Sequence, residues 1–339
     1  LPIWDLVASG EFLYTNTINN VFYQNLNIKG PVGRLNGVDN RPFYDRNDVI
    51  DDTYGRIILA TNTDKGYTYN ATFKLTKQFD NGFYGQVAYT YGEAKNIFEG
   101  TSSQNSSQWR NLRTVNGKNA NPGVARSQFS LGSRLTANAA YEFSYGKNDM
   151  FKTTISLFYN GLEGQPFSYI YNEGRDLLND DSRDNALIYI PRDASEIEFV
   201  GSPQEQQQQW NQLNTFINNN SYLNDRRGQY AERNGDRGPW SHIIDLKLLQ
   251  DFNLQVGKKV HTLQFSFDIF NFTNLLNKDW GRRKFVRSEV GLLTTEEGGP
   301  NPKFSFDNRF NESGIVEFDD SGILSSRWQM QVGLRYIFK

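Results

Sequence analysis

The chain ends in the stretch SSRWQMQVGLRYIFK, residues 325–339, in which apolar and polar side chains alternate. The apolar positions are Trp328, Met330, Val332, Leu334, Tyr336 and Phe338, and the positions between them are Gln329, Gln331, Gly333 and Arg335. Successive side chains of a β-strand point to opposite faces, so this stretch predicts a strand with one apolar and one polar face. If the apolar face contacts a packed core, the chain is a soluble β-sandwich. If it contacts lipid, the polar face lines the lumen of a membrane barrel.

The same alternation recurs along the chain. It is present in segments 66–80, 82–95, 127–145, 241–256 and 259–273. Soluble strands usually run about five or six residues, whereas a tilted membrane strand needs about 9–11. Tyr and Phe cluster near the ends of the apolar faces, where the aromatic girdle of a membrane barrel lies. The pattern therefore favours an all-β, antiparallel transmembrane barrel.

Composition agrees with a barrel and excludes several other classes. Hydrophobic residues make up 37% of the chain, below the roughly 45–50% of typical soluble domains, while aromatic residues reach 14%. The absence of cysteine excludes disulfides and thiolate metal sites. A net charge of −2 gives no basis for nucleic-acid binding. No apolar run approaches the ~18 residues of a transmembrane helix.

The connections between the predicted strands alternate in length. Tight turns at 80–82, 146–148 and 257–258 alternate with long polar stretches at 28–65, 96–126 and 166–240. Outer-membrane barrels have short periplasmic turns and long extracellular loops. About ten membrane strands are expected, at 6–27, 66–80, 82–95, 127–145, 149–165, 241–256, 259–273, 282–294, 302–310 and the C-terminal stretch. Segment 54–63 does not fit this alternation and is expected as an extra strand within the first extracellular loop.

The large extracellular loop at 166–240 contains one predicted helix, near 203–219. Pro203 and Glu205 suit a helix start. Trp210, Leu213, Phe216 and Ile217 follow at helical spacing. The glutamine run within this segment could instead be a disordered low-complexity tract, but the apolar stripe favours an amphipathic helix over the barrel mouth.

Four stretches carry a further signal: SSRWQMQVGLRYIF (325–338), TLQFSFDIFNFTNLLNKDWG (262–281), RGQYAERNGDRGPW (227–240) and ALIYIP (186–191). They resemble the barrel end of TonB-dependent outer-membrane receptors, and within that family the Oar-like branch. The resemblance covers essentially the whole chain and is most specific in 227–281 and the final strand. It implies a barrel of about 22 strands, of which residues 1–339 supply the C-terminal part. An N-terminal plug and a carboxypeptidase-regulatory-like domain would lie outside this chain. Lys339 departs from the pattern, because such barrels usually finish on the aromatic residue.

The resemblance also implies a function and a set of partners. Substrate, favoured as peptide- or protein-derived, would bind the extracellular loops and be imported with energy passed from TonB through the plug. The expected partners are outer-membrane lipid and lipopolysaccharide, the plug and remaining barrel strands, TonB, and a surface lipoprotein or other outer-membrane protein. The expected location is the outer membrane of a Gram-negative bacterium, with no cofactor and no nucleic acid. The alternative is a structural, secretion- or adhesion-associated surface protein without active import. A soluble sugar-binding β-sandwich ranks last.

Two sets of residues are candidates for contacts with substrate or plug. Exposed aromatic and cationic groups in the loops are candidate substrate contacts: Trp109, Arg110, Arg226, Arg227, Tyr230, Arg233, Trp240, Trp280, Arg282 and Arg283. For the arginines of 226–237, loop packing and ion pairing with Asp225, Glu232 and Asp236 is the favoured alternative. Charged groups on the polar strand faces are candidate lumen or plug contacts: Arg134, Glu142, Asp245, Lys247, Asp268 and Arg335. The second set is expected to pair mutually, with water and with the plug.

No motif predicts catalysis or a metal centre. The chain lacks GxSxG and GxxxxGK[ST], and neither His242 nor His261 has metal-ligand spacing around it. The acidic cluster at 179–184 offers oxygen ligands for calcium but lacks the central Gly and closing Glu of an EF-hand. A solvated loop is the favoured interpretation there, and also for Glu317, Asp319 and Asp320. The protein is therefore not expected to be an enzyme.

Overall fold

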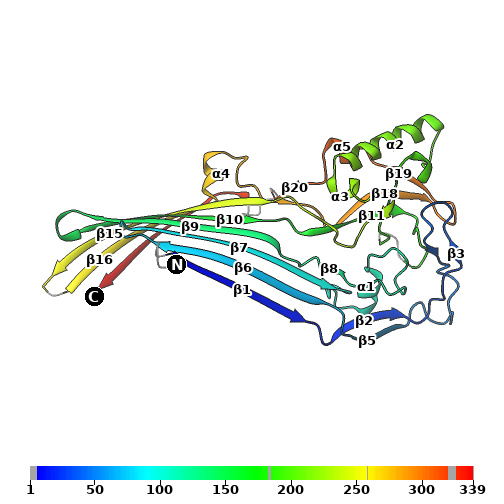
Figure 1. The fold of residues 1–339 in the computed structure, drawn as a ribbon, viewed down its shortest axis with the longest axis horizontal. Coiled ribbons are helices and arrows are strands. Elements are labelled where there is room, and N and C mark those ends of the chain that lie inside the picture. Colours follow the sequence, from blue (N-terminus) through cyan, green and yellow to red (C-terminus); the bar gives the residue numbers. More distant parts are fainter. Residues whose placement is uncertain (1–5, 182–184, 258, 320–325, 339) are drawn as a thin grey trace.

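A nine-stranded antiparallel sheet runs along most of the molecule (Figure 1). The computed structural model describes residues 6–181, 185–257, 259–319 and 326–338. In order across the sheet, the strands are β1 (Leu6–Asn16), β6 (Tyr67–Gln78), β7 (Phe83–Asn96), β9 (Gly132–Tyr145), β10 (Phe151–Leu162), β15 (Ser241–Val256), β16 (Lys259–Phe270) and β21 (Gln329–Phe338), with β8 (Ala125–Arg126) beside β7. The eight long strands have 10 to 16 residues each.

The strand register confirms the two faces predicted from the alternation. Directly opposed residues of an antiparallel pair share a face of the sheet. One line of opposed residues is apolar and runs through Val332, Phe267, Leu248, Ile155 and Tyr141. The adjacent line is largely polar and runs through Gln331, Asp268, Lys247, Ser156 and Ala140. The apolar positions of neighbouring strands therefore form one continuous surface.

The apolar face of this sheet is not the face of a packed core. None of the residues in the main buried cluster belongs to the eight long strands, within the part of the chain that the structure describes. Large apolar side chains on the face are exposed, including Phe73 and Val332, and Leu334 is 66% exposed. A β-sandwich would bury this face against a second sheet. The observed exposure contradicts the sandwich alternative.

The short turns lie together at one end of the sheet. Gly82 between β6 and β7, Gly146 between β9 and β10, and Gly257 after β15 all have positive φ, at 86°, 83° and 64°. A Cβ on Gly82 would lie 2.2 Å from the carbonyl oxygen of Glu142, so this turn requires glycine. The long connections extend from the opposite end (Figure 1), as the alternation of lengths predicted. Lys258, in the third turn, lies outside the described residues.

A separate folded unit, here called the cap, sits at the end of the sheet with the long connections (Figure 1). It is built mainly from residues 166–237 and 286–306 and contains the main buried cluster. Its sheet has the order β14 (Asp236–Arg237), β11 (Pro166–Gly174), β18 (Glu289–Glu297) and β19 (Lys303–Phe306). Strands β11 and β18 are parallel. Helix α2 (Pro203–Asn218) covers this sheet and buries Leu213, Phe216 and Ile217.

Helix α2 begins as the sequence indicated. The Ser202 side chain accepts from the backbone N–H of Glu205, and the Glu205 carboxylate accepts from the backbone N–H of Ser202. This reciprocal capping box satisfies two helix-end donors, and Pro203 occupies the first turn without loss of a needed donor. The glutamine run is therefore an ordered helix rather than a low-complexity tract.

Three strand predictions need correction. Segments 282–294 and 302–310 are not membrane strands, because β18 and β19 lie in the cap, and β17 (Lys284–Phe285) pairs with β20 (Glu317–Phe318). Both Leu292 and Leu293 are buried, so β18 is covered on both faces. Segment 6–27 divides into β1 and β2 (Asn20–Asn25). The extra strand expected within 54–63 is confirmed as β5 (Ile58–Thr63), which pairs with β2.

The remaining elements are short. They are β3 (Gly33–Arg34), β4 (Pro42–Phe43), β12 (Tyr189–Ile190), β13 (Gln229–Tyr230), α1 (Asn105–Arg110), α3 (Ser221–Asn224), α4 (Phe272–Leu276), α5 (Arg309–Glu312), η1 (Lys147–Asp149) and η2 (Ala194–Glu196). Among the described residues, no helix has the length and apolarity needed to cross a membrane.

Candidate functional site

The cap is joined to the long sheet by buried polar contacts from the segment 227–240. The guanidinium of Arg233 donates to the backbone carbonyls of Asn96 and Ile97, at the end of β7. The neighbouring Asn234 amide donates to Glu99 Oε1 at 2.8 Å and to the Arg126 carbonyl at 2.7 Å. Burial lowers the pKa of Arg233 to about 10. These residues act as an anchor between cap and sheet.

Further arginines extend this joint. Buried Arg113, from the 96–126 connection, makes an ion pair with the exposed Glu289 at the start of β18. Arg237 donates to the Ser130 carbonyl at 3.2 Å and the Gly164 carbonyl at 3.3 Å. A guanidinium supplies several donors in a fixed plane, which suits carbonyl groups at the ends of different strands. The position of the cap over the sheet is therefore specified by hydrogen bonds as well as by apolar packing.

A buried arginine lies inside the cap. Arg41 has no exposed side-chain surface and donates to Asp39 Oδ1 at 2.7 Å and to the Leu187 carbonyl at 2.8 Å. Its guanidinium lies 4.8 Å from the ring centroid of Tyr230 and 5.4 Å from that of Tyr171. Cation–π contacts and one ion pair thus compensate the charge of Arg41. The arrangement ties the first long connection to β11 and β13.

The acidic cluster at 179–184 makes ion pairs in its described part, and the expectation of a solvated loop is wrong for Asp180. Asp180 is buried and pairs with Lys118, which also donates its backbone N–H to Asp180 at 2.8 Å. Asp181 pairs with Arg56 at 2.8 Å and with Arg110 at 3.2 Å. Residues 182–184 lie outside the described residues. No group of three or more acidic, His or Cys side chains suited to a metal occurs among the residues described.

Two cavities of the cap are lined by charged and aromatic residues. One, of about 610 Å³, lies beside α2 and is lined by Asp39, Tyr189, Glu196, Trp210 and Phe304 among others. Its carboxylates have protein partners: Asp39 pairs with Arg41, and Glu196 pairs with Arg192 at 3.4 Å. The other, of about 910 Å³, is lined by residues that include Arg110, Asp176, Asp181 and Glu289. Burial, and then the charge of Asp180, raises the pKa of Asp176 to about 6.

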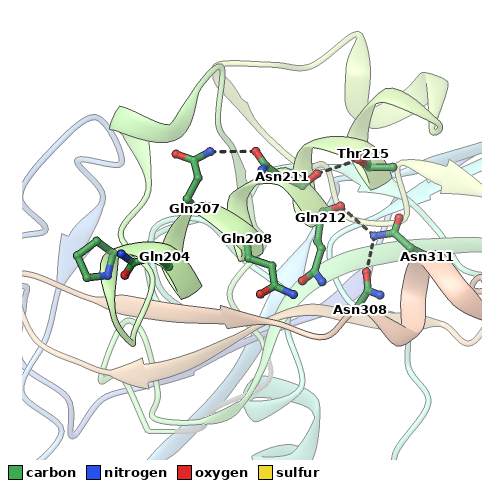
Figure 2. A pocket seen from close by; sticks show the side chains of 9 residues that line it. Gln204, Gln207, Gln208, Asn211, Gln212, Thr215, Asn308 and Asn311 are labelled. Atoms are coloured by element: carbon green, nitrogen blue, oxygen red, sulfur yellow. Dashed lines mark hydrogen bonds between the residues drawn. The ribbon is translucent and has the colours of Figure 1, made fainter.

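A third hollow, here called the amide groove, runs along the exposed side of α2 (Figure 2). Its volume is about 680 Å³. It is lined by Pro203, Gln204, Gln207, Gln208, Asn211, Gln212, Thr215, Asn308 and Asn311. Every lining side chain is uncharged, and seven of the nine are primary amides. Asn311 of α5 donates to the Gln212 carbonyl at 2.9 Å, which fixes α5 against α2.

The structure corrects the prediction that Trp109 is an exposed substrate contact. Its side chain is completely buried, and its indole N–H donates to Asn119 Oδ1 at 2.8 Å. The neighbouring Arg110 is half exposed and lines the 910 Å³ cavity beside Asp181. Trp109 therefore has a structural role, and only Arg110 lies at the wall of a cavity.

Most candidates in the 226–240 segment contact the protein itself. Arg226 pairs with Glu232 at 3.2 Å, an ion pair expected from the sequence. Arg227 donates to the Asn214 and Asn218 side chains of α2, both at 2.7 Å. Buried Arg233 is the anchor described above, so its assignment as an exposed contact is wrong. Tyr230 lies beside Arg41 and, with Arg233, lines a further cavity of about 470 Å³. Trp240 stacks on His242 at 6.1 Å between ring centroids.

The candidates after α4 lie on another part of the surface. Trp280 is 55% exposed, and Arg283 is also exposed. The guanidinium of Arg282 lies 3.7 Å from the ring centroid of Phe318. None of the three lines any of the three cavities described above. Of the second acidic group, Glu317 pairs with Arg287 at 2.6 Å, and Asp320 lies outside the described residues.

The six candidates on the polar strand faces share one face of the long sheet. The register places Arg134, Glu142, Asp245, Lys247, Asp268 and Arg335 together on it. Lys247 pairs with Asp268 at 2.6 Å, as the expectation of mutual pairing required. Glu142 instead pairs with Lys152 at 2.9 Å, Arg134 donates to Asn160 at 3.0 Å, and Asp245 accepts from the backbone of Asn271 at 2.7 Å.

Sequence reasoning missed the amide groove and the buried charges Arg41, Arg113 and Lys118. The charges carry no local signal, because their partners come from distant segments: Lys118 and Asp180 are 62 positions apart. The groove does have a signal. Gln204, Gln208 and Gln212 recur at intervals of four, which places three amides on one face of a helix.

Comparison with known proteins identifies one family. A family model described as "Outer membrane beta barrel domain" matches residues 5–304. No curated protein and no solved structure matches the chain.

Proposed function

Because this chain belongs to the outer-membrane β-barrel domain family, we propose that it forms part of the barrel of a TonB-dependent transporter. The family places the protein in the bacterial outer membrane. There the exposed apolar face of the long sheet contacts lipid, and the opposite face, with Lys247 and Asp268, is directed to the lumen. In this proposal, the plug contacts that polar face, and the remaining barrel strands pair with the edge strands β1 and β21.

The observation that carries the proposal is the cap itself. A separately packed unit over one end of a barrel provides surfaces and cavities where a substrate can bind before it passes through the lumen. The cap has its own buried core, lies at the end opposite the short turns, and carries several cavities, including the amide groove. We assign substrate binding to the cap and passage to the polar lumen. Energy would reach the plug through TonB, and a peptide- or protein-derived substrate suits the uncharged amide groove.

The proposal is tested by uptake into whole cells. Three strains are compared: the parent, one lacking this protein, and one lacking TonB. Each is given a fluorescently labelled peptide mixture derived from a digested protein. Both deletions are expected to reduce uptake to the same background level. Uptake that needs this protein but not TonB would contradict active import.

The alternative is a surface anchor for adhesion or secretion. It predicts equal uptake in all three strains and a change in surface attachment or in exported protein only when this chain is deleted. A stable outer-membrane partner recovered with the protein, without any TonB dependence, would favour this alternative.

A further inference from the structure

The amide groove displays hydrogen-bonding groups at regular intervals. Gln204, Gln208 and Gln212 form one row along α2, and Gln207, Asn211 and Thr215 form a second row beside it. Residues four apart lie on the same face of a helix. Figure 2 shows Gln208 and Gln212 directed toward the side of the groove formed by Asn308 and Asn311. The groove is thus walled by amides on both sides.

The first row has no hydrogen-bond partners within the described part of the chain. Neither Gln204, Gln208 nor Gln212 makes a side-chain hydrogen bond there, although the Gln212 carbonyl accepts from Asn311. Glutamines elsewhere on the same helix behave differently. Gln206 donates to the Gly201 carbonyl at 3.0 Å, and Gln209 donates to the Val200 carbonyl at 2.9 Å. The amides of this first row are therefore available to a ligand, whereas Gln207 donates to Asn211 at 2.9 Å and Asn311 donates to Asn308 at 3.1 Å.

The spacing of the row matches an extended peptide. Four helical residues advance about 6 Å, at about 1.5 Å per residue. Two residues of an extended chain advance about 6.7 Å, and their backbone groups on one side repeat at that interval. A primary amide offers two donors and one acceptor oxygen, which complements the N–H and C=O groups of a peptide backbone. The interval from Gln204 to Thr215 corresponds to about 17 Å, or about five extended residues.

We propose that the amide groove binds an extended, uncharged peptide segment of about five residues through its backbone. This inference rests on the proposed function, whose substrate class it specifies. The absence of charge in the lining excludes ion pairing as the basis of recognition. No aromatic ring lines the groove, so a sugar ring would have no face on which to stack. Side chains of an extended peptide project to its two faces, at right angles to the backbone groups that would contact the helix, so recognition would depend weakly on their identity.

The test uses the full-length protein in detergent and titration calorimetry. The probe is the pentapeptide Ser-Val-Ser-Val-Ser, acetylated and amidated so that it carries no charge. We expect the triple variant Gln204→Ala, Gln208→Ala and Gln212→Ala to weaken binding at least tenfold. Alanine favours helix, so this variant is expected to fold, and circular dichroism and the unfolding temperature check that it does. The matched control Asn219→Ala removes an amide just after the C-terminal end of α2, outside the groove, and should change affinity less than twofold.

A second probe isolates the backbone. The same pentapeptide methylated on its backbone nitrogens keeps its side chains but loses its donors, and it should also bind at least tenfold more weakly. Equal binding of the two peptides would overturn the proposal. So would a triple variant that binds the peptide as tightly as the parent, a parent protein that does not bind the peptide, or a parent protein that binds a linear glucose pentamer more tightly than the peptide. If peptide binding fails while TonB-dependent uptake persists, this inference is wrong and the proposed function stands. If the peptide binds as expected but uptake is independent of TonB, the proposed function is wrong.

Discussion

Lys118 and Asp180 form an ion pair whose side chains are only 1% and 2% exposed. The two residues come from different long connections, and the pair joins them inside the cap. The ammonium of Lys118 also lies 5.7 Å from the ring centroid of buried Trp109. Removing both charges from water is costly, and the cost is recovered only while both partners are present.

Loss of one partner of this pair should destabilise the cap strongly. Lys118→Met leaves Asp180 buried without its cation, and we expect a loss of about 3–5 kcal/mol. The double variant Lys118→Met with Asp180→Leu removes both charges and should recover a large part of that loss. Chemical denaturation followed by tryptophan fluorescence measures both. A double variant no more stable than the single variant would contradict this account of the pair.

Arg233 should act as an anchor rather than as a substrate contact. Arg233→Ala leaves the Asn96 and Ile97 carbonyls without their donor, at a cost on the order of 3 kcal/mol. Hydrogen exchange should then accelerate in β11 and β18 of the cap and remain slow in β9 and β10. The matched control is Arg226→Ala, which removes an arginine paired at the surface with Glu232 and should have little effect. Equal acceleration in the long sheet would contradict a role at the joint.

The long strands were predictable because apolar and polar residues alternate over ten or more positions, and only an extended strand with two different faces produces that alternation. A strand with one apolar and one polar face produces it whether the apolar face meets lipid or protein. The 282–294 segment was misassigned because it also has β-forming residues and a similar length. Its distinguishing mark is the adjacent pair Leu292 and Leu293, both buried, which indicates a strand covered on both faces.

The candidate site was less predictable because it is formed by the tertiary fold. Arg41 and Leu187 are 146 positions apart, and Arg233 and Ile97 are 136 apart, so no local pattern announces their contacts. The composition of segments 226–240 and 280–283 shows that they are rich in polar and aromatic residues. It does not show which of their side chains face solvent. Helix α2 was an exception, since its cap residues and apolar stripe are local signals. The same helical spacing also positions the row Gln204, Gln208 and Gln212.

Asp176 should make the cap less stable as the pH rises from about 4 to about 6. Burial and the nearby Asp180 raise its pKa from 3.8 to about 6 in the folded protein. The folded state therefore binds a proton more tightly than the unfolded chain, and its contribution to stability is fully present below about pH 4 and lost as the pH passes 6. Asp176→Asn, which stays neutral, should remove this dependence. The check is the unfolding temperature of both proteins between pH 4 and 7; parallel pH profiles would refute the assignment.

An added arginine should destabilise the protein on the apolar face of β21 and have little effect on its polar face. Leu334→Arg places a cation on the exposed apolar face, and near the middle of the bilayer this costs about 2–4 kcal/mol in a membrane barrel. Gln331→Arg introduces the same side chain three residues away on the polar face, where Asp268 is its direct cross-strand neighbour. We expect this control to fold nearly as well as the parent. Folding of the full-length protein into lipid vesicles, followed across a urea series, compares the three proteins. Equal destabilisation of the two arginine variants would mean that the apolar face does not contact lipid. The assignment of the polar face to the lumen would then also be wrong.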